Sequence, residues 1–181
     1  MHCDPQMSVV FVDESKNRKY TVVAAVIEPG KLATMRQALR ALVLPGQRRL
    51  HFTHESDARR RAVLTRLVEL EVAAHVFQSG LARERDAREE CLGELVAFAV
   101  REGHRRIVLE RDASIEKSDR RVLFRELRAR GAGDGFQYEF EGPIDEPLLW
   151  IPDAVAWSFV KGGDWRRRIA TIVQGVTTAG A

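Results

Sequence analysis

The sequence predicts an α/β protein, a mixed sheet with helices packed on it, because strand-like apolar runs alternate along the chain with helix-like segments. The chain opens with two strands, at 8–13 and 19–28, and so short a connection between them makes an antiparallel hairpin. Its 181 residues, 45% hydrophobic and 30% charged, suit one domain with a sizeable core. We expect a single domain over 1–181, with a core within about 8–161 and a C-terminal helix at about 164–174.

The remaining elements follow from apolar spacing and from glycine and proline breaks. Helices are predicted at 31–43, 57–70, 84–102, 116–130 and 148–161, strands at 72–78, 105–111 and 136–141, and an extended piece at 49–53.

Acidic side chains follow two of the apolar strands. The run 8–12 is almost wholly apolar, as in a strand buried on both faces, and it stops on Asp13 and Glu14. The run 107–109 likewise leads into Glu110 and Asp112. Carboxylates there are costly unless hydrogen bonds or a cation compensate them. Together with Asp153, which lies in an apolar segment, they suggest a metal site.

Asp13, Asp112 and Asp153 are the expected catalytic metal ligands. Asp112 ends a strand that can lie beside the first, and Asp153 begins a helix that can pack across both. Mg²⁺ is bound through one or two carboxylates with waters and substrate phosphates, and two such ions about 3.5–4 Å apart can cleave a phosphodiester. We expect Asp13 to bridge two ions, Asp112 to hold one and Asp153 to hold the other.

Three further carboxylates are secondary candidates. Glu110 lies two residues before Asp112 and shares its strand face if the strand stays regular, so it is the substitute ligand. Glu14 should leave the face opposite to Asp13 and is a weaker metal candidate. Glu55 is the candidate for a fourth catalytic carboxylate.

Each acid also has a purely structural interpretation. Asp13 lies in a segment with good turn chemistry. Asp112 can end a strand in a turn or precede a helix. Asp153, directly after Pro152, can occupy a first helical turn, where the helix dipole favours a carboxylate.

His51 and His54 form a weaker pattern. On an extended backbone the two side chains fall on opposite faces, so they are not expected to bind zinc together. His54 can orient a water or contact phosphate, or it can be a surface residue before a helix.

The chain is mildly basic, with a net charge of +3 and a pI of about 9.1. Arginine clusters supply much of this charge and suit phosphate contacts, although arginines also simply solvate helix faces. Trp165 lies beside an arginine run and is a candidate for stacking on a base. The predicted nucleic-acid-binding residues are His54, Arg59, Arg60, Trp165, Arg166 and Arg167.

The placement of Asp13, Asp112 and Asp153 resembles the ribonuclease H-like superfamily, in which acids of a first strand, an adjacent strand and a late helix meet at one edge. The segment from Pro152 to Ala156 is similar to the Ala-Asp-Ala helix of the Holliday-junction resolvases. A nearer resemblance is to the bacterial family catalogued as domain of unknown function 3800. Its members open with a strand ending in Asp-Glu-Ser, as at Asp13, and close with an aliphatic-Ala-Asp helix, as at Asp153.

Two positions depart from that family's pattern: Lys16 stands where a glycine is usual, and the mid-chain Glu/His element is represented only by His51, His54 and Glu55. The resemblance implies a ribonuclease H-like nuclease that uses Mg²⁺ or Mn²⁺ and acts on nucleic acid. The alternative is a non-catalytic nucleic-acid-binding or interaction module on the same fold, with a protein partner or a second copy. No apolar stretch approaches membrane-spanning length, and we expect a cytoplasmic protein.

Overall fold

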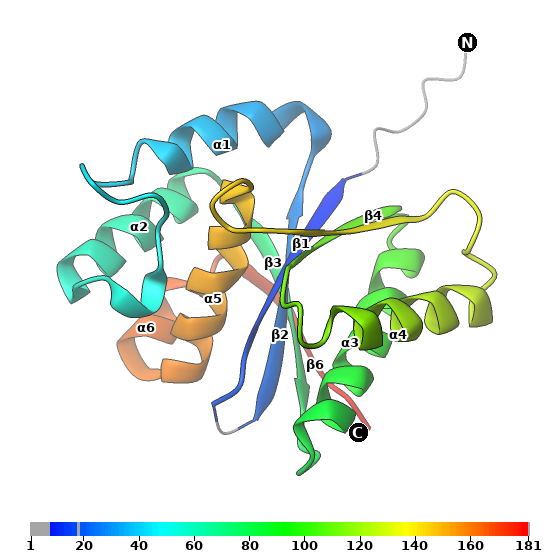
Figure 1. Ribbon diagram of the computed structural model, residues 1–181. Coiled ribbons are helices and arrows are strands. Elements are labelled where there is room, and N and C mark those ends of the chain that lie inside the picture. The colour runs from blue at the N-terminus through cyan, green and yellow to red at the C-terminus, as the bar shows by residue number, and fades with distance from the viewer. Residues whose placement is uncertain (1–7, 18, 181) are drawn as a thin grey trace.

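The computed structural model describes residues 8–17 and 19–180 and contains a six-stranded sheet of order β5-β4-β1-β2-β3-β6 (Figure 1). The strands are β1 (Val9–Ser15), β2 (Tyr20–Ile27), β3 (Ala73–Ser79), β4 (Arg106–Glu110), β5 (Gln137–Glu141) and β6 (Val173–Thr178). β2 pairs with β1 and β3 in antiparallel fashion, while β4 runs parallel to both β1 and β5. The opening hairpin and the mixed α/β architecture are therefore confirmed.

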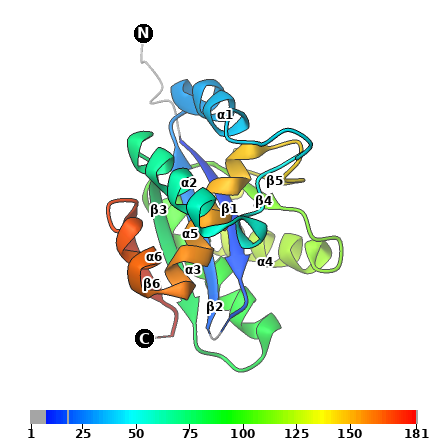
Figure 2. The ribbon, with the colours of Figure 1, turned by 90° about the vertical axis from the view of Figure 1, so that its left-hand side faces the viewer.

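Helices cover both faces of the sheet (Figures 1 and 2). One face carries α1 (Leu32–Arg40), α2 (Asp57–Glu69), α5 (Trp150–Lys161) and α6 (Gly163–Arg168), and the other carries α3 (Glu84–Arg101) and α4 (Glu116–Ala129). Short 3₁₀ turns lie at Pro29–Lys31, Phe52–His54 and Pro147–Leu149. Within the described residues, no helix is both long and apolar enough to cross a membrane.

β1 is apolar throughout its first half because it is buried on both faces. Val9 and Phe11 pack into the hydrophobic core beneath α5, whereas Val10 and Val12 pack into a second core beneath α3. Successive side chains of a strand point to opposite faces, so each residue enters one core or the other. The continuous apolar run is explained by this central position.

The predicted C-terminal helix at 164–174 is wrong beyond Arg168, where α6 ends. The chain instead forms β6, which pairs in parallel with β3 at the sheet edge. Burial alternates residue by residue along β6, which is the period of a half-exposed strand. Gly175 lies so close to His75 that an added Cβ would be 2.9 Å from its Nδ1 atom.

Candidate active site

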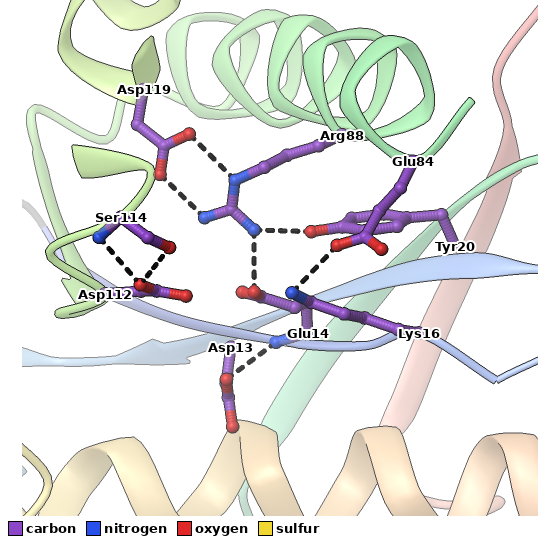
Figure 3. A network of polar contacts seen from close by, with 9 residues as sticks. All are labelled: Asp13, Glu14, Lys16, Tyr20, Glu84, Arg88, Asp112, Ser114 and Asp119. Atoms are coloured by element: carbon purple, nitrogen blue, oxygen red, sulfur yellow. Dashed lines mark hydrogen bonds and ion pairs between the residues drawn. The ribbon is translucent and has the colours of Figure 1, made fainter. Parts of the chain in front are cut away.

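The end of β1 divides its two acidic side chains between the faces of the sheet. Asp13 follows Phe11 by two positions and therefore leaves β1 on the face of α5, while Glu14 follows Val12 and faces α3 and α4. Figure 3 shows the two carboxylates pointing in opposite directions. Asp13 is thus the acid of β1 that can meet Asp153 of α5.

Glu110 is the acid of β4 that lies beside Asp13. β1 and β4 are parallel, and the last pair in their register is Val12 with Leu109, so the next position on each strand is Asp13 and Glu110. Val108 packs into the core beneath α5, and Glu110, two residues later, leaves β4 on that same face. Glu110 therefore takes the place that the sequence prediction gave first to Asp112.

Burial raises the pKa values of all three carboxyl groups, and neighbouring negative charges raise those of Asp13 and Glu110 further. The pKa of Asp13 is well above its ordinary value because of burial, and the negative charges of Glu110 and Asp153 add to the effect. The pKa of Glu110 is raised by burial and then by Asp153. Burial also raises the pKa of Asp153, against the hydrogen bond that its Oδ2 accepts from the Phe52 amide at 3.1 Å. The ionised form of each of these acids is therefore disfavoured by its surroundings.

Asp112 lies in a turn and not in the strand, because β4 ends at Glu110. Its Oδ1 accepts hydrogen bonds from the Ser114 amide at 2.9 Å and the Ser114 hydroxyl at 2.6 Å, and these bonds lower the pKa of Asp112. Its carbonyl accepts from the amides of Ile115 and Glu116, which begins α4. The structure thus favours the turn alternative for Asp112, and Glu110 replaces it among the candidate ligands.

Glu14 belongs to a polar network on the other face of the sheet (Figure 3). Arg88 of α3, which is 7% exposed, lies 2.8 Å from Glu14 Oε1 and donates to both oxygens of Asp119 at 2.8 and 2.7 Å. It also donates to the Tyr20 hydroxyl at 2.5 Å. Its carboxylate is paired there, and a metal-ligand role for Glu14 stays a prediction.

The segment 49–54 passes over Asp153 and places both histidines on one side. The expected extended backbone is wrong here: residues 52–54 form a 3₁₀ turn, closed by the bond from the His54 amide to the His51 carbonyl at 2.9 Å. Residues three apart eclipse each other in such a turn, and the rings of His51 and His54 stack at 4.1 Å. His51 Nδ1 is buried and has no hydrogen-bond partner among the described residues. Burial lowers the pKa of His51. The spacing of three residues between His51 and His54 is the signal in the sequence that fits a 3₁₀ turn, and the prediction of an extended backbone did not use it.

Glu55, the predicted fourth carboxylate, is buried and already paired. Its Oε2 lies 3.3 Å from Arg59 Nε, and its Oε1 accepts from the Gln47 amide group at 3.2 Å. Arg59 also donates to the carbonyl of Leu42. These contacts tie the loop before α2 together, and a catalytic role for Glu55 stays a prediction.

Arg60 of α2 and Trp157 of α5 hold the same segment. Arg60 donates to the Phe52 carbonyl at 2.9 Å and the Thr53 carbonyl at 2.6 Å, and its guanidinium lies 4.3 Å from the Trp157 ring centre. Trp157 also meets Phe52 and Trp165 edge to face, at 5.4 and 5.3 Å. Arg60 is thus engaged within the protein, and a phosphate contact by it stays a prediction.

The basic residues of α6 are at the surface. Arg166 lies over the Phe159 ring at 3.9 Å, and Arg167 pairs with Asp164 at 3.3 Å. Trp165 is partly exposed. These side chains are accessible to a ligand, and their binding to nucleic acid stays a prediction, as it does for the exposed His54.

A cavity of about 280 Å³ lies next to Trp157, and another, of about 230 Å³, is lined by Asp13, Glu14, Lys16, Glu110, Arg111 and Asp112. The second opens at the ends of β1 and β4, and Asp153 is not among its lining residues. In the part of the chain that the structure describes, no three His, Cys, Asp or Glu side chains lie close enough together to hold a metal ion. The carboxylate oxygens of Asp13, Glu110 and Asp153 are hard donors of the kind that Mg²⁺ and Mn²⁺ bind. Their side chains do not point to a common position close enough to coordinate one ion.

Comparison with known proteins identifies the fold. No family model matches the chain, and no curated protein matches it. Ribonuclease HII from Archaeoglobus fulgidus, solved in a complex with PCNA, is 15% identical with a TM-score of 0.57, over 91% of this chain and 75% of that one. The fold is ribonuclease H-like. Bst-RNase HIII, solved in complex with Mn²⁺, is 14% identical with a TM-score of 0.50, over 86% of this chain and 52% of that one.

At these identities the likeness establishes the ribonuclease H-like fold alone. The chain spans about half the length of the Bst-RNase HIII structure. The resemblances to the domain of unknown function 3800 family and to the resolvases rest on their motif residues and not on these comparisons.

Proposed function

We propose that the protein is a divalent-metal-dependent nuclease that hydrolyses phosphodiester bonds of DNA or RNA. The observation that carries the proposal is that Asp13, Glu110 and Asp153, from two strands and a helix, lie on one face of a ribonuclease H-like sheet, near enough for Glu110 and Asp153 to raise the pKa of Asp13. Partly buried acids with perturbed pKa values are a mark of functional sites. Such a cluster is relieved by a cation.

Asp13 would be the bridging ligand, and Glu110 and Asp153 would each hold one ion. When bound, one or two Mg²⁺ or Mn²⁺ ions supply Lewis acidity toward the phosphodiester and lower the pKa of water. The chain's own part is to fix the donors: β1 and β4 are held by their register, and the Phe52 amide orients Asp153. The Mn²⁺ in the Bst-RNase HIII structure supports this choice of metals.

Nucleic acid would approach the cavity at the ends of β1 and β4. The net charge of +3 and the surface residues Trp165, Arg166 and Arg167 support binding of a phosphate backbone. Binding by such contacts should weaken steeply as salt rises.

The test is cleavage of single- and double-stranded DNA and RNA by the purified protein with Mg²⁺ or Mn²⁺. Asp13→Asn, Glu110→Gln and Asp153→Asn should each lower the rate by roughly a hundredfold or more, and Asp112→Asn should leave it within a few-fold. Absence of any cleavage that Asp13→Asn removes would overturn the proposal.

A non-catalytic nucleic-acid-binding module is the second candidate. It is favoured by the absence, among the described residues, of a ready-formed cluster of three metal-binding side chains. Salt-sensitive binding of nucleic acid that a chelator does not alter, without cleavage under any metal, would support it.

A further inference from the structure

A cavity of about 510 Å³ lies between α3 and α4, on the face of the sheet opposite to α5. Sites for small molecules usually enclose about 300–1,000 Å³, so this volume suits an organic molecule and exceeds what a single ion needs. Its apolar part is formed by Leu92 of α3, by Val122 of α4 and by Ile115, which directly precedes α4. The proposed nuclease chemistry makes no use of this cavity.

The acids that line the cavity are already paired with cations of the protein. Their ion pairs are Glu84 with Lys16 at 2.8 Å, Glu89 with Arg125 at 2.5 Å and Asp119 with Arg88 at 2.7 Å. Figure 3 shows two of these pairs, Glu84 with Lys16 and Asp119 with Arg88. Because Arg88 also holds Glu14, it has no spare charge to offer a ligand. Neither the acids nor Arg88 therefore sets the charge that a ligand would meet.

Three other cations line the same cavity and have no such partner. They are Arg85 of α3 and Lys117 and Arg121 of α4, all of them exposed. Within residues 8–17 and 19–180, no ion pair or hydrogen bond engages their charged groups. The cavity thus combines an apolar wall with three positive charges that are available to a ligand.

We propose that this cavity binds a small organic phosphate, a molecule with an apolar or aromatic body and a phosphate monoester group. A phosphate monoester carries a charge of about −1.5 to −2 at pH 7 and three strong acceptor oxygens, so it matches three cations better than a single carboxylate does. Arginine supplies paired N–H donors to such a group, and lysine supplies a point charge. The body of the ligand lies against Leu92 and Val122. Binding at this site requires no metal ion.

Titration of the ¹⁵N-labelled protein with phenyl phosphate in EDTA, followed by NMR, tests the proposal. Saturable shifts are expected for amides that line the cavity, such as those of Leu92 and Ser118. The amides of Arg166 and Arg167, an exposed pair of arginines outside the cavity, should not follow the same curve. Phenyl phosphate should bind at least about tenfold more tightly than inorganic phosphate, because its ring buries apolar surface.

Variants of the exposed cations test the phosphate contact without disturbing the core. Arg121→Gln and Lys117→Gln should each weaken the binding of phenyl phosphate by about three- to tenfold, as a charge-assisted bond is lost. Arg128→Gln is the matched control, since Arg128 is an exposed arginine of α4 that lies over the Phe124 ring and outside the cavity. It should bind phenyl phosphate as the wild type does.

Three results would each overturn the proposal: no saturable shift at the cavity, equal affinity for phenyl phosphate and inorganic phosphate, or equal affinity in Arg121→Gln, Lys117→Gln and Arg128→Gln. None of these measurements involves cleavage or a metal ion. Their failure therefore leaves the nuclease proposal untouched, and a failure of the nuclease proposal leaves this site standing.

Discussion

The Phe52 amide donates a hydrogen bond of 3.1 Å to Asp153 Oδ2, joining two residues 101 positions apart in the chain. This bond links the 3₁₀ turn at Phe52–His54 to the first turn of α5. It orients one of the three acids of the proposed site. The turn itself is anchored by the buried Phe52 ring, whose burial contributes about 1.5–3 kcal/mol.

Arg60 should control the order of this turn, because it donates to the carbonyls of both Phe52 and Thr53. Arg60→Ala is expected to raise the hydrogen-exchange rate of the Phe52 amide by about tenfold, as two charge-assisted bonds are lost. Arg61→Ala is the control, since Arg61 is exposed and its guanidinium lies over the Trp165 ring at 5.4 Å, away from the turn's carbonyls. Equal exchange in the two variants would show that Arg60 does not hold the turn.

The metal-free protein should lose stability as the pH rises through the range in which the cluster ionises. The pKa of Asp13 is raised in the folded state. The stabilisation that goes with its protonated form is therefore fully present below the ordinary carboxyl pKa of about 4, and it is lost as the pH rises through the raised pKa of the folded state. Asp13→Asn has no carboxyl group to ionise at this position, so it does not lose this stability as the pH rises. In EDTA, the free energy of unfolding of Asp13→Asn minus that of the wild type should grow with pH, to about 1 kcal/mol or more at pH 8.

Urea unfolding between pH 4.5 and 8 measures this difference. Asp112→Asn is the matched control: the pKa of Asp112 is lowered by its Ser114 bonds, so this variant should show no gain at high pH. A difference between Asp13→Asn and wild type that stays constant with pH would contradict the raised pKa of Asp13.

The network around Arg88 should be the most sensitive polar contact in the protein. Arg88→Met leaves the carboxylates of Glu14 and Asp119 without their shared partner in a buried setting, and we expect a loss of ~3–5 kcal/mol in the free energy of unfolding. Arg125→Met removes an exposed arginine with two partners and should cost at most ~1 kcal/mol. Similar losses in the two variants, measured by urea unfolding at pH 7, would rule out a special role for Arg88.

The sequence predicted the central strand that carries Asp13 because its signal is local. An apolar run buried on both faces belongs to a central strand, although β1 continues beyond the run to Ser15 and not only to the predicted residue 13. The choice between Glu110 and Asp112 was not local. Both side chains lie on the same face of the sheet if the strand continues through Asp112. The choice of ligand therefore depended on where β4 ends, and strand boundaries are the least certain part of any prediction from sequence.

The other errors also came from tertiary contacts that no local pattern contains. The segment 173–178 is a strand because β3 offers it an edge to pair with, whereas its own residues are compatible with more than one state. The pairing of Glu55 with Arg59 and of Glu14 with Arg88 depends on loops and helices arriving from elsewhere in the chain. The sequence showed the acids, and the fold decided which of them face one another.

Mn²⁺ binding by the wild type, Asp13→Asn, Glu110→Gln and Asp112→Asn tests the central claim most directly. The proposed site predicts that Asp13→Asn and Glu110→Gln each weaken binding by roughly tenfold or more, while Asp112→Asn binds as the wild type does. Loss of binding in Asp112→Asn with full binding in Glu110→Gln would contradict the assignment of Glu110 and place the metal at the turn after β4.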